Sequence, residues 1–280
     1  MIIYRSFSSF AKKEHFGSFK NIVLLVAFAI LATSNSYAQA SFETIDGLRY
    51  LIDSDAKTAT LTANPNGENY TGDIVVPGKV KASNGVEYTV TSLGANCFYC
   101  CTGLTSINIP SSVTSLGDCC FCWCSGLTSI TIPSSVTSLG GSCFYWCPGL
   151  TSITIPSSVT SLGEDCFHGC SGLTSITIPS SVTSLGEGCF LGCKGLTSIN
   201  IPSSVTSLGA SCFSWCSGLT SITIPSSVTS LGEKCFEECS GLTSITIPSS
   251  VTYLGDLCFL LCIYNHRTTK TNQKYPSVNL

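Results

Sequence analysis

The sequence predicts a solenoid built from 23-residue coils, and two regularities support that prediction. Phenylalanine recurs every 23 residues without one insertion or deletion, and a strand-like apolar pattern ending in proline recurs with it. A fixed period of this length is typical of solenoids, because a single coil is too small to bury its own apolar face. The predicted fold class is therefore a β-rich α/β solenoid with a parallel β-sheet on one face. The repeat phenylalanines are Phe98, Phe121, Phe144, Phe167, Phe190, Phe213, Phe236 and Phe259.

The coil at residues 150–172, LTSITIPSSVTSLGEDCFHGCSG, contains the elements that we expect in every unit. Its first six residues follow an L-x-x-I-x-I pattern, which points apolar side chains inward and hydroxyl side chains outward along a strand. Pro156 ends this strand because proline has no N–H to donate to the ladder. Val159 and Leu162 predict a second short strand, and Gly163 supplies a turn that glycine adopts at little cost.

The last third of the coil predicts a single helical turn. Cys166, Phe167 and Cys170 place apolar atoms on one face of such a turn, and we expect Gly172 to stop it. Seven complete first strands and eight of these turn segments follow one another along the chain. We therefore expect the first strands on one face of the solenoid, and the short second strands and helical turns on the other.

Residues 1–38 have the features of a secretory signal peptide. Four basic residues lead into an apolar run of 11 residues at positions 22–32, followed by small and polar residues with a cleavage pattern that ends at Ala38. A transmembrane helix needs about 20 apolar residues, so the run is too short to span a bilayer. We expect secretion and no transmembrane segment in the mature chain, and an uncleaved membrane anchor is the alternative.

Three further segments are expected after the signal peptide. Residues 39–89 predict an N-terminal β-strand cap, because the alternating segments IDGLRYLID and TATLTA flank a turn and indicate a β-hairpin that covers the open end of the solenoid. In the same region GDIVVPGKV is similar to the strand of the repeat followed by its proline. Residues 90–262 form the array of about eight coils. Residues 263–280 are polar and without period, which predicts either a disordered tail or a truncated array.

The charge distribution disfavours nucleic acid as a partner. The chain has a net charge of −3, and between Val90 and Cys262 it has eight acidic residues but only two lysines, Lys194 and Lys234. Without a basic patch the array lacks the electrostatic attraction on which nucleic-acid binding depends. The sequence makes no prediction of the oligomeric state.

Nineteen cysteines are many more than a cytosolic protein normally has, and they indicate an oxidising compartment or a structural use of the thiol. Sixteen of them form two columns, one directly before the repeat phenylalanine and one three residues after it. Equivalent residues of adjacent coils lie about 4.8 Å apart, within the Cα range of disulfides, but buried cysteine also acts as a small hydrophobic side chain. We expect a ladder of mostly buried thiols, and a disulfide ladder is the open alternative. In the middle coils this ladder contains Cys120, Cys124, Cys143, Cys147, Cys166, Cys170, Cys189 and Cys193.

Four cysteines have the spacing of a zinc ribbon. Cys97, Cys100, Cys119 and Cys122 form a C-x₂-C-x₁₈-C-x₂-C pattern. In the repeat frame Cys97 belongs to the first column, whereas the other three are single substitutions at variable positions. We interpret the spacing as fortuitous and predict neither a metal site nor any other cofactor.

The array also lacks the residues of a catalytic site. A nucleophilic cysteine needs a neighbouring base, and the array holds one histidine, His168, at a position that other coils fill with Tyr99, Tyr145, Leu191 or Ser214. We interpret His168 as a surface residue. The G-x-S-x-G, P-loop and dinucleotide-binding glycine patterns are missing from the sequence. We therefore predict no catalytic residues and no enzymatic activity.

The repeated coil xxLTSITIPSSVTSLGxxCFxxC resembles that of the BspA-type leucine-rich repeat proteins of Bacteroides-like bacteria, as does the preceding segment with GDIVVP and EYTVTSLG. The resemblance covers residues 42–262, and the I-x-I-P, S-V-T-S-L-G and F-x-x-C elements occur in family order seven times. The sequence departs from the family directly before the phenylalanine, where the family usually has alanine and every coil here has cysteine. The resemblance implies a leucine-rich repeat solenoid that is secreted or displayed on the cell surface as an adhesion or protein-binding module. It also implies host matrix proteins as ligands and supplies no catalytic residues.

The outward hydroxyl groups of the first strands form a candidate binding surface. Such ladders suit hydrogen-bonded recognition of a protein or glycan, and they equally suit an inert exposed sheet, so both interpretations stay open. Aromatic residues at variable positions, such as Tyr99, Trp123, Trp146 and Trp215, either anchor a partner or shield the turns. The candidate ladder residues are Thr128, Ser129, Thr131, Thr151, Ser152, Thr154, Thr174, Ser175 and Thr177.

These observations predict a secreted or cell-surface, non-catalytic adhesion protein. We expect it to recognise an extracellular protein, such as a host matrix protein, or a glycan through its repeat array. The alternative is a structural cell-envelope repeat protein without a host ligand.

Overall fold

The computed structural model describes residues 40–65 and 67–262. The chain divides into Met1–Ala40 and Ser41–Leu280, and the architecture below is that of the second unit. The signal peptide predicted at residues 1–38 and the tail predicted at 263–280 lie outside the described residues. Within the described ranges the chain forms seventeen strands and has no helix that is long and apolar enough to cross a membrane.

The region predicted to be a cap is β-structured in the described chain. β2 and β3 form an antiparallel hairpin in which Tyr50 lies opposite Leu61, and β3 then pairs in parallel with β6. β5 pairs with β6 in antiparallel orientation. The limits predicted for cap and array, at residues 39–89 and 90–262, stay predictions. The strands of this region are β1 (Ala40–Ile45), β2 (Leu48–Asp53), β3 (Thr58–Thr62), β4 (Gly72–Val75), β5 (Lys79–Lys81) and β6 (Glu87–Leu93).

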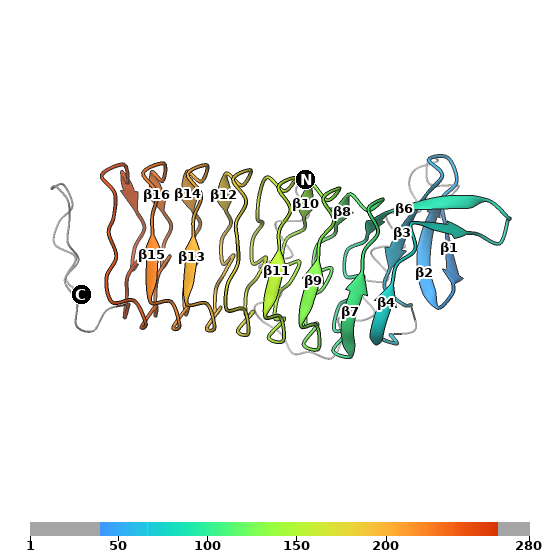
Figure 1. Cartoon of the computed structure of the whole chain (residues 1–280), viewed down its shortest axis with the longest axis horizontal. Coiled ribbons are helices and arrows are strands. Elements are labelled where there is room, and N and C mark those ends of the chain that lie inside the picture. The colour runs from blue at the N-terminus through green and yellow to red at the C-terminus, as the bar shows by residue number, and fades with distance from the viewer. Residues whose placement is uncertain (1–39, 66, 263–280) are drawn as a thin grey trace. The chain divides into compact units, whose positions relative to one another are not determined.

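The predicted parallel sheet of first strands lies along one face of the coil stack (Figure 1). Residues 23 positions apart pair in register, as Ile153 does with Ile130, so each coil repeats the same contacts. β4 takes the place of a first strand at the start of this face, where Ile74 pairs with Ile107. The other strands of this face are β7 (Leu104–Asn108), β9 (Ser129–Thr131), β11 (Ser152–Thr154), β13 (Ser198–Asn200) and β15 (Ser221–Thr223).

Two of the seven predicted first strands do not form as strands. Residues 173–178 form no strand and have only isolated bridges, from Thr177 to Thr154 and to Asn200, and residues 242–247 have no strand. Backbone hydrogen bonds from the 173–178 segment to both neighbouring coils are long. The Thr174 N–H donates to the Thr151 carbonyl, and the Thr197 N–H donates to the Thr174 carbonyl, each at 3.5 Å. A ladder with such long bonds is only partly formed.

A second parallel ladder continues from the cap on another side of each coil. β6 pairs with β8, and Leu162 forms an isolated bridge with Leu185 where the ladder has no strand of its own. The strands are two residues long, and they contain the leucine of the predicted Val-x-x-Leu segment but not its valine. They are β8 (Ser115–Leu116), β10 (Ser138–Leu139), β12 (Ser184–Leu185), β14 (Ser207–Leu208), β16 (Ser230–Leu231) and β17 (Tyr253–Leu254).

The predicted helical turn is wrong, because the cysteine-phenylalanine segments form tight turns rather than helix. In a helix every N–H would donate to the carbonyl four residues earlier. Here the Phe167 N–H donates at 2.8 Å to the Cys189 carbonyl of the next coil, whereas the Cys170 N–H donates at 3.2 Å to Phe167 within the turn. Asp165 and Gly169 have left-handed backbone, with φ values of 53° and 73°, which breaks any helical path. The turns therefore contribute inter-coil hydrogen bonds that a helix could not make.

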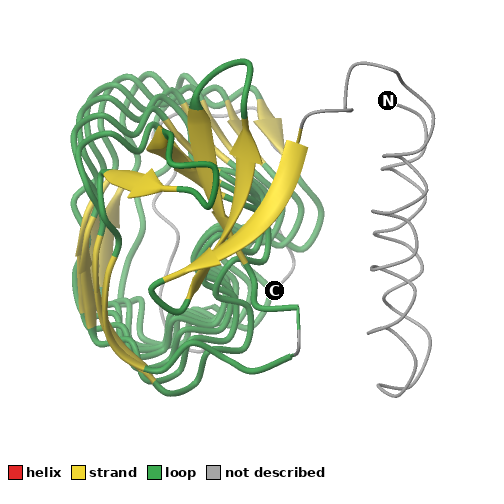
Figure 2. Cartoon of the chain, turned by 90° about the vertical axis from the view of Figure 1, so that its right-hand side faces the viewer, coloured by secondary structure: helices red, strands yellow, loops and turns green. Residues whose placement is uncertain are grey.

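The core is a set of side-chain columns that run along the stack, and successive coils superpose when viewed from the cap end (Figure 2). Phe144 and Phe167, for example, stack with ring centroids 5.4 Å apart and planes 1° apart, and both are fully buried. Leucine, isoleucine, valine and cysteine columns fill the remaining interior.

Close approach of consecutive coils, rather than turn conformation, explains two glycine columns. Neither Gly163 nor Gly172 has a positive φ, so neither position needs glycine for its backbone conformation. A Cβ at Gly172 would lie 2.3 Å from the Pro148 carbonyl oxygen of the preceding coil, and one at Gly186 would lie 2.6 Å from the Gly163 carbonyl carbon. At Gly163 itself the nearest atom, the Gly141 Cα, is 3.5 Å away. Most coils thus approach one another too closely for a side chain at these positions.

Candidate binding surfaces

The hydroxyl ladders predicted from the sequence lie side by side on the strand face. Pairing of β9 with β11 places Ser152 beside Ser129 and Thr154 beside Thr131, and an isolated bridge continues the row to Thr177. The structure thus brings the predicted residues together on one continuous surface. All nine are exposed, namely Thr128, Ser129, Thr131, Thr151, Ser152, Thr154, Thr174, Ser175 and Thr177.

Part of this ladder is used to hold the coils together. The Thr151 hydroxyl donates a hydrogen bond to the Thr128 carbonyl oxygen at 3.1 Å, and Thr220 makes the same bond to Thr197 at 3.1 Å. These bonds run between neighbouring coils. The first threonine of such a strand therefore has a structural role besides any contact with a partner.

An acidic side chain begins the strand face. The Asp73 carboxylate of β4 accepts hydrogen bonds from the Ser106 hydroxyl at 2.6 Å and the Thr105 hydroxyl at 2.8 Å. These two bonds, with that from Ser106 the stronger influence, lower the pKa of Asp73. The sequence signal was the acidic residue in GDIVVP at a position where the array has a hydroxyl residue.

Aromatic side chains from neighbouring coils gather on the turn edge of the array. The Trp123 and Trp146 rings stack with centroids 5.1 Å apart and planes 10° apart. Tyr145 lies 6.2 Å from Trp123 and 4.5 Å from His168, centroid to centroid. We call these four residues the aromatic cluster. In the sequence they are single residues at variable positions, but positions 23 residues apart lie next to each other in the stack.

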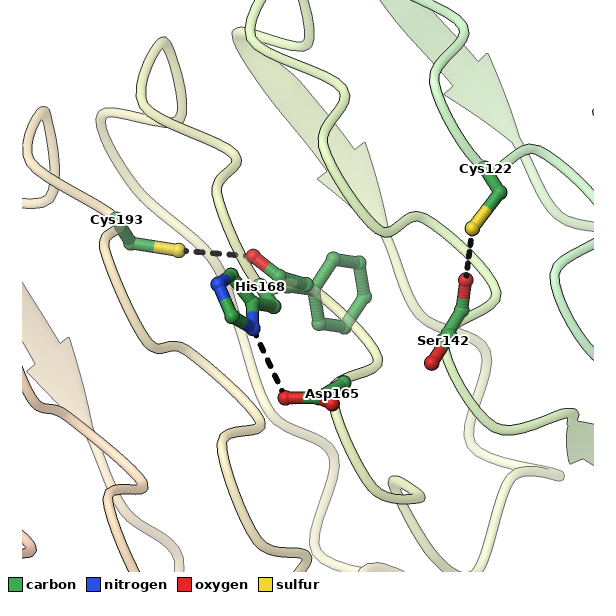
Figure 3. A network of polar contacts seen from close by, with 6 residues as sticks. Cys122, Ser142, Asp165, His168 and Cys193 are labelled. Carbon is green, nitrogen blue, oxygen red and sulfur yellow. Dashed lines mark hydrogen bonds and ion pairs between the residues drawn. The ribbon is translucent and has the colours of Figure 1, made fainter. Parts of the chain in front are cut away.

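The aromatic cluster reaches solvent and has a polar neighbour. Trp123 and Trp146 are 37% and 40% exposed, and Trp215 occupies the same position of a later coil with 49% exposure. His168 is half-buried, and its Nδ1 lies 2.9 Å from the Asp165 carboxylate (Figure 3). The residue interpreted as a lone surface histidine is thus paired with a carboxylate.

The two cysteine columns lie in the core. All sixteen column residues are buried, and all nineteen cysteines, which fall within the described residues, are free. Thiols of the second column donate to the phenylalanine carbonyl oxygen of an adjacent coil, as Cys193 does to Phe167 at 3.2 Å and Cys170 to Phe144 at 3.1 Å. The redox state of the columns in solution stays a prediction.

Burial suppresses ionisation of these thiols. It raises the pKa of Cys101 to about 11 and the pKa of Cys166 and Cys216 to about 12. Burial likewise raises the pKa values of Cys189 and Cys193 well above the ordinary value for cysteine. The thiolate is the reactive form of cysteine, so we expect the column thiols with raised pKa values to be inert in the folded protein near neutral pH.

The three cysteines outside the columns lie at the turn edge of the first coils. Cys100 and Cys119 are half-buried, and Cys122 is 3% exposed. Across residues 40–65 and 67–262, no group of three or more histidine, cysteine or acidic side chains is arranged to hold a metal ion. The zinc-ribbon spacing therefore corresponds to no metal-binding cluster in this part of the chain.

Sequence comparison places the repeat in a known family. The model of the BspA type leucine rich repeat region matches residues 91–218 and 138–266, with six copies. The chain belongs to this family. The matched ranges cover the coils that carry the cysteine columns and the aromatic cluster. No curated protein sequence matches the BspA type chain.

Solved structures share the fold of this BspA type array. A leucine rich repeat protein of T. pallidum has 24% identity and a TM-score of 0.52, over 77% of this chain and 86% of that one. One from Bacteroides ovatus has 24% identity and a TM-score of 0.50, over 79% and 80% of the two chains. One from Eubacterium ventriosum has 24% identity and a TM-score of 0.50, over 88% of this chain and 53% of the longer chain. At this identity the likeness establishes the leucine-rich repeat solenoid fold.

Proposed function

We propose that the protein is a secreted or cell-surface adhesion protein that binds an extracellular protein through its repeat array. Membership of the BspA type family supports a repeat-based binding role. The observation that carries the proposal is the aromatic cluster, in which two stacked indoles, 37% and 40% exposed, stand at the turn edge. Tryptophan and tyrosine are enriched among the residues that dominate the energy of protein interfaces.

The strand face supplies a second, repetitive surface. Its hydroxyl groups recur every 23 residues in register, so a partner that contacts one coil can contact the next in the same way. Each contact is weak, and affinity then grows with the number of coils engaged. We propose that the aromatic cluster anchors the partner and that the strand face adds these repeated contacts.

The location rests on two supports. The signal peptide predicted at residues 1–38 directs the chain out of the cytoplasm. Proteins of the BspA type family are commonly found at the bacterial cell surface, which agrees with export.

The test is a binding screen of the purified chain against immobilised extracellular matrix proteins and glycans. For a ligand found there, we expect the double variant Trp123→Ala/Trp146→Ala to weaken binding at least about tenfold, because truncating an anchor typically costs more than 1 kcal/mol. Trp215→Ala is the matched control, since Trp215 has the same position in its coil and is 49% exposed. Unchanged binding by the double variant, or equal loss in the control, contradicts the anchor.

A strand-face variant locates the site if the anchor fails. Thr131→Glu/Thr154→Glu/Thr177→Glu places three charges in one exposed row, and loss of binding in this variant alone assigns the partner to the strands. If the screen finds no ligand and the protein is retained in washed cell envelopes, the structural envelope role is favoured instead.

A further inference from the structure

Cys119 and Cys122 stand at two positions where packing does not require cysteine. The phenylalanine columns and the two cysteine columns fill the core, whereas these two positions precede and follow the buried Cys120-Phe121 pair. Two coils later the same positions hold Asp165 and His168, both polar. The role of cysteine as a small core residue therefore leaves the half-buried Cys119 unexplained, whereas Cys122 is buried beside the core.

The local turn brings the two positions together. The Cys122 N–H donates to the Cys119 carbonyl oxygen at 3.1 Å, which closes a tight turn. Such a turn holds its first and fourth Cα atoms within about 7 Å, a range that overlaps the 4–7 Å accepted by disulfides. Asp165 and His168 show that side chains at these positions touch, because their polar atoms are 2.9 Å apart (Figure 3).

The two thiols differ in accessibility and ionisation. Cys119 is half-buried with a left-handed φ of 51°, whereas Cys122 is 3% exposed and its Sγ lies 3.5 Å from the Ser142 carbonyl oxygen. Interaction with the neighbouring Cys122 side chain lowers the pKa of Cys119, although burial and the Asp118 and Asp165 carboxylates oppose this, and the same interaction raises the pKa of Cys122. Cys119, the more exposed of the two, thus forms a thiolate more readily than Cys122, which lies next to it in the turn.

We propose that Cys119 and Cys122 are a thiol–disulfide exchange pair for low-molecular-weight disulfides. The Cys119 thiolate attacks one sulfur of a disulfide RSSR, forms a mixed disulfide and releases RS⁻, which takes up a proton. The Cys122 thiol then loses its proton and attacks the Cys119 sulfur, releasing the second RS⁻. Two protein thiols are oxidised to one disulfide, and RSSR is reduced to two RSH.

A second pair with the same spacing provides an internal comparison. Cys97 and Cys100 are also three residues apart, but the Cys100 N–H donates at 2.8 Å to the Cys122 carbonyl of the next coil. The turn that joins Cys119 to Cys122 is therefore not made between Cys97 and Cys100. Cys97 is also 1% exposed, so we expect this pair to remain reduced.

The experiment uses the full chain and oxidised glutathione as the probe. After incubation, acid quenching, alkylation and proteolysis, mass spectrometry should find a disulfide between Cys119 and Cys122, with two reduced glutathione molecules released per chain. Cys122→Ser should stop at a glutathione adduct on Cys119. Cys119→Ser should slow glutathione release at least about tenfold, because seventeen of the eighteen remaining thiols are buried and Cys100 has no partner thiol across its own turn. Cys100→Ser is the control and should react like the unchanged chain.

Circular dichroism of each variant before the reaction shows that the compared chains share one fold. The proposal is overturned if Cys119 and Cys122 stay reduced in the folded chain. It is also overturned if Cys119→Ser reacts at the rate of the unchanged chain, or if Cys97 and Cys100 form a disulfide as fast as Cys119 and Cys122.

Discussion

At the residue scale, the positions directly before each column cysteine have left-handed backbone. Ser211 and Trp215 of one coil have φ values of 52° and 61°, and the corresponding positions of the preceding coil are Gly188 and Gly192, with 59° and 71°. Left-handed backbone costs a residue with a Cβ roughly 1–2 kcal/mol. The array therefore places its most variable residues, including the exposed tryptophans, at positions where only glycine is free of this cost.

Ser211→Gly should stabilise the chain by about 0.5–1 kcal/mol, because the relief of backbone strain exceeds the added entropy of the unfolded glycine. Ala210→Gly is the matched control, since Ala210 has no positive φ, and it should destabilise the chain by a similar amount. Denaturant unfolding followed by circular dichroism measures both changes. Destabilisation by Ser211→Gly would show that its side chain matters more than its backbone.

The two cysteine columns differ in their hydrogen bonds, which predicts unequal costs of truncation. Cys193→Ala removes buried sulfur and also the bond from the thiol to the Phe167 carbonyl at 3.2 Å. Cys189→Ala removes buried sulfur from a position that the family usually fills with alanine. We expect Cys193→Ala to cost about 0.5–1 kcal/mol more in unfolding free energy. Equal losses in urea unfolding would mean that the thiol bond contributes nothing net.

At the element scale, the spacing of coils is set by two glycine columns as much as by the short strands. A Cβ at Gly149 or Gly218 would lie 2.3 or 2.2 Å from a carbonyl oxygen of the preceding coil, at Ser125 or Lys194. Real Cβ atoms do not come this close, so the coils would have to separate. Separation would lengthen the backbone hydrogen bonds that join neighbouring coils.

Gly186→Ala and Gly163→Ala test the role of close coil contact at one glycine column, and we expect them to differ in their effect on stability. The Gly186 Cβ would lie 2.6 Å from backbone of the preceding coil, whereas the Gly163 Cβ would have 3.5 Å. Overpacking of this kind typically costs about 1–3 kcal/mol, so Gly186→Ala should lower the unfolding free energy by that amount. Gly163→Ala should change it by less than about 0.5 kcal/mol. Comparable losses in both variants would mean that glycine is needed at this column for its backbone flexibility rather than for close approach of the coils.

The period and the inward pattern of Leu150, Ile153 and Ile155 were enough to predict the coil and its parallel face, because both depend on apolar spacing alone. The turn segment was mispredicted as helical because Cys166 and Phe167 fit one face of either structure, and the choice depends on hydrogen bonds to the next coil. Such bonds join residues 22 or more positions apart, which a local pattern does not report.

The candidate surfaces were also predictable to different extents, because a local sequence pattern does not report contacts between coils. The hydroxyl ladder follows from strand alternation and the 23-residue period, which together predict that Thr131 and Thr154 lie side by side, as they do in the pairing of β9 with β11. The contact between Trp123 and Trp146 needed the additional step of aligning the variable positions of neighbouring coils. The pairing of His168 with Asp165 follows from the turn in which the His168 N–H donates to the Asp165 carbonyl at 3.1 Å, and this turn was not predicted from the sequence.

At the scale of the whole molecule, the stack concentrates titratable thiols in one continuous core. Fourteen cysteines have raised pKa values, most of them because burial penalises the thiolate. Each one is protonated in the folded chain at a pH where the unfolded chain has begun to lose that proton. The pH dependence of stability thus comes from many separate thiols rather than from one site.

This concentration of thiols predicts alkaline unfolding. A cysteine with an unfolded pKa near 9 and a higher folded pKa stabilises the fold fully below pH 9, and its contribution falls as pH rises through the window up to the folded value, about 12 for Cys166. At pH 10 the loss is about 1.4 kcal/mol per thiol, so ten such thiols lose as much as the whole stability of an ordinary domain, about 5–15 kcal/mol.

Urea unfolding at pH 7, 9 and 10, without reductant, should therefore show a steep fall of the unfolding free energy above pH 9. The control is Cys143→Ala/Cys166→Ala/Cys189→Ala/Cys212→Ala, which removes four titrating thiols and leaves the tyrosines and lysines in place. Its loss between pH 7 and pH 10 should be smaller by about 1.4 kcal/mol for each thiol removed. A disulfide ladder has no thiol proton to release. Equal pH dependence in the two chains would therefore contradict the thiol ladder and favour disulfides in the columns.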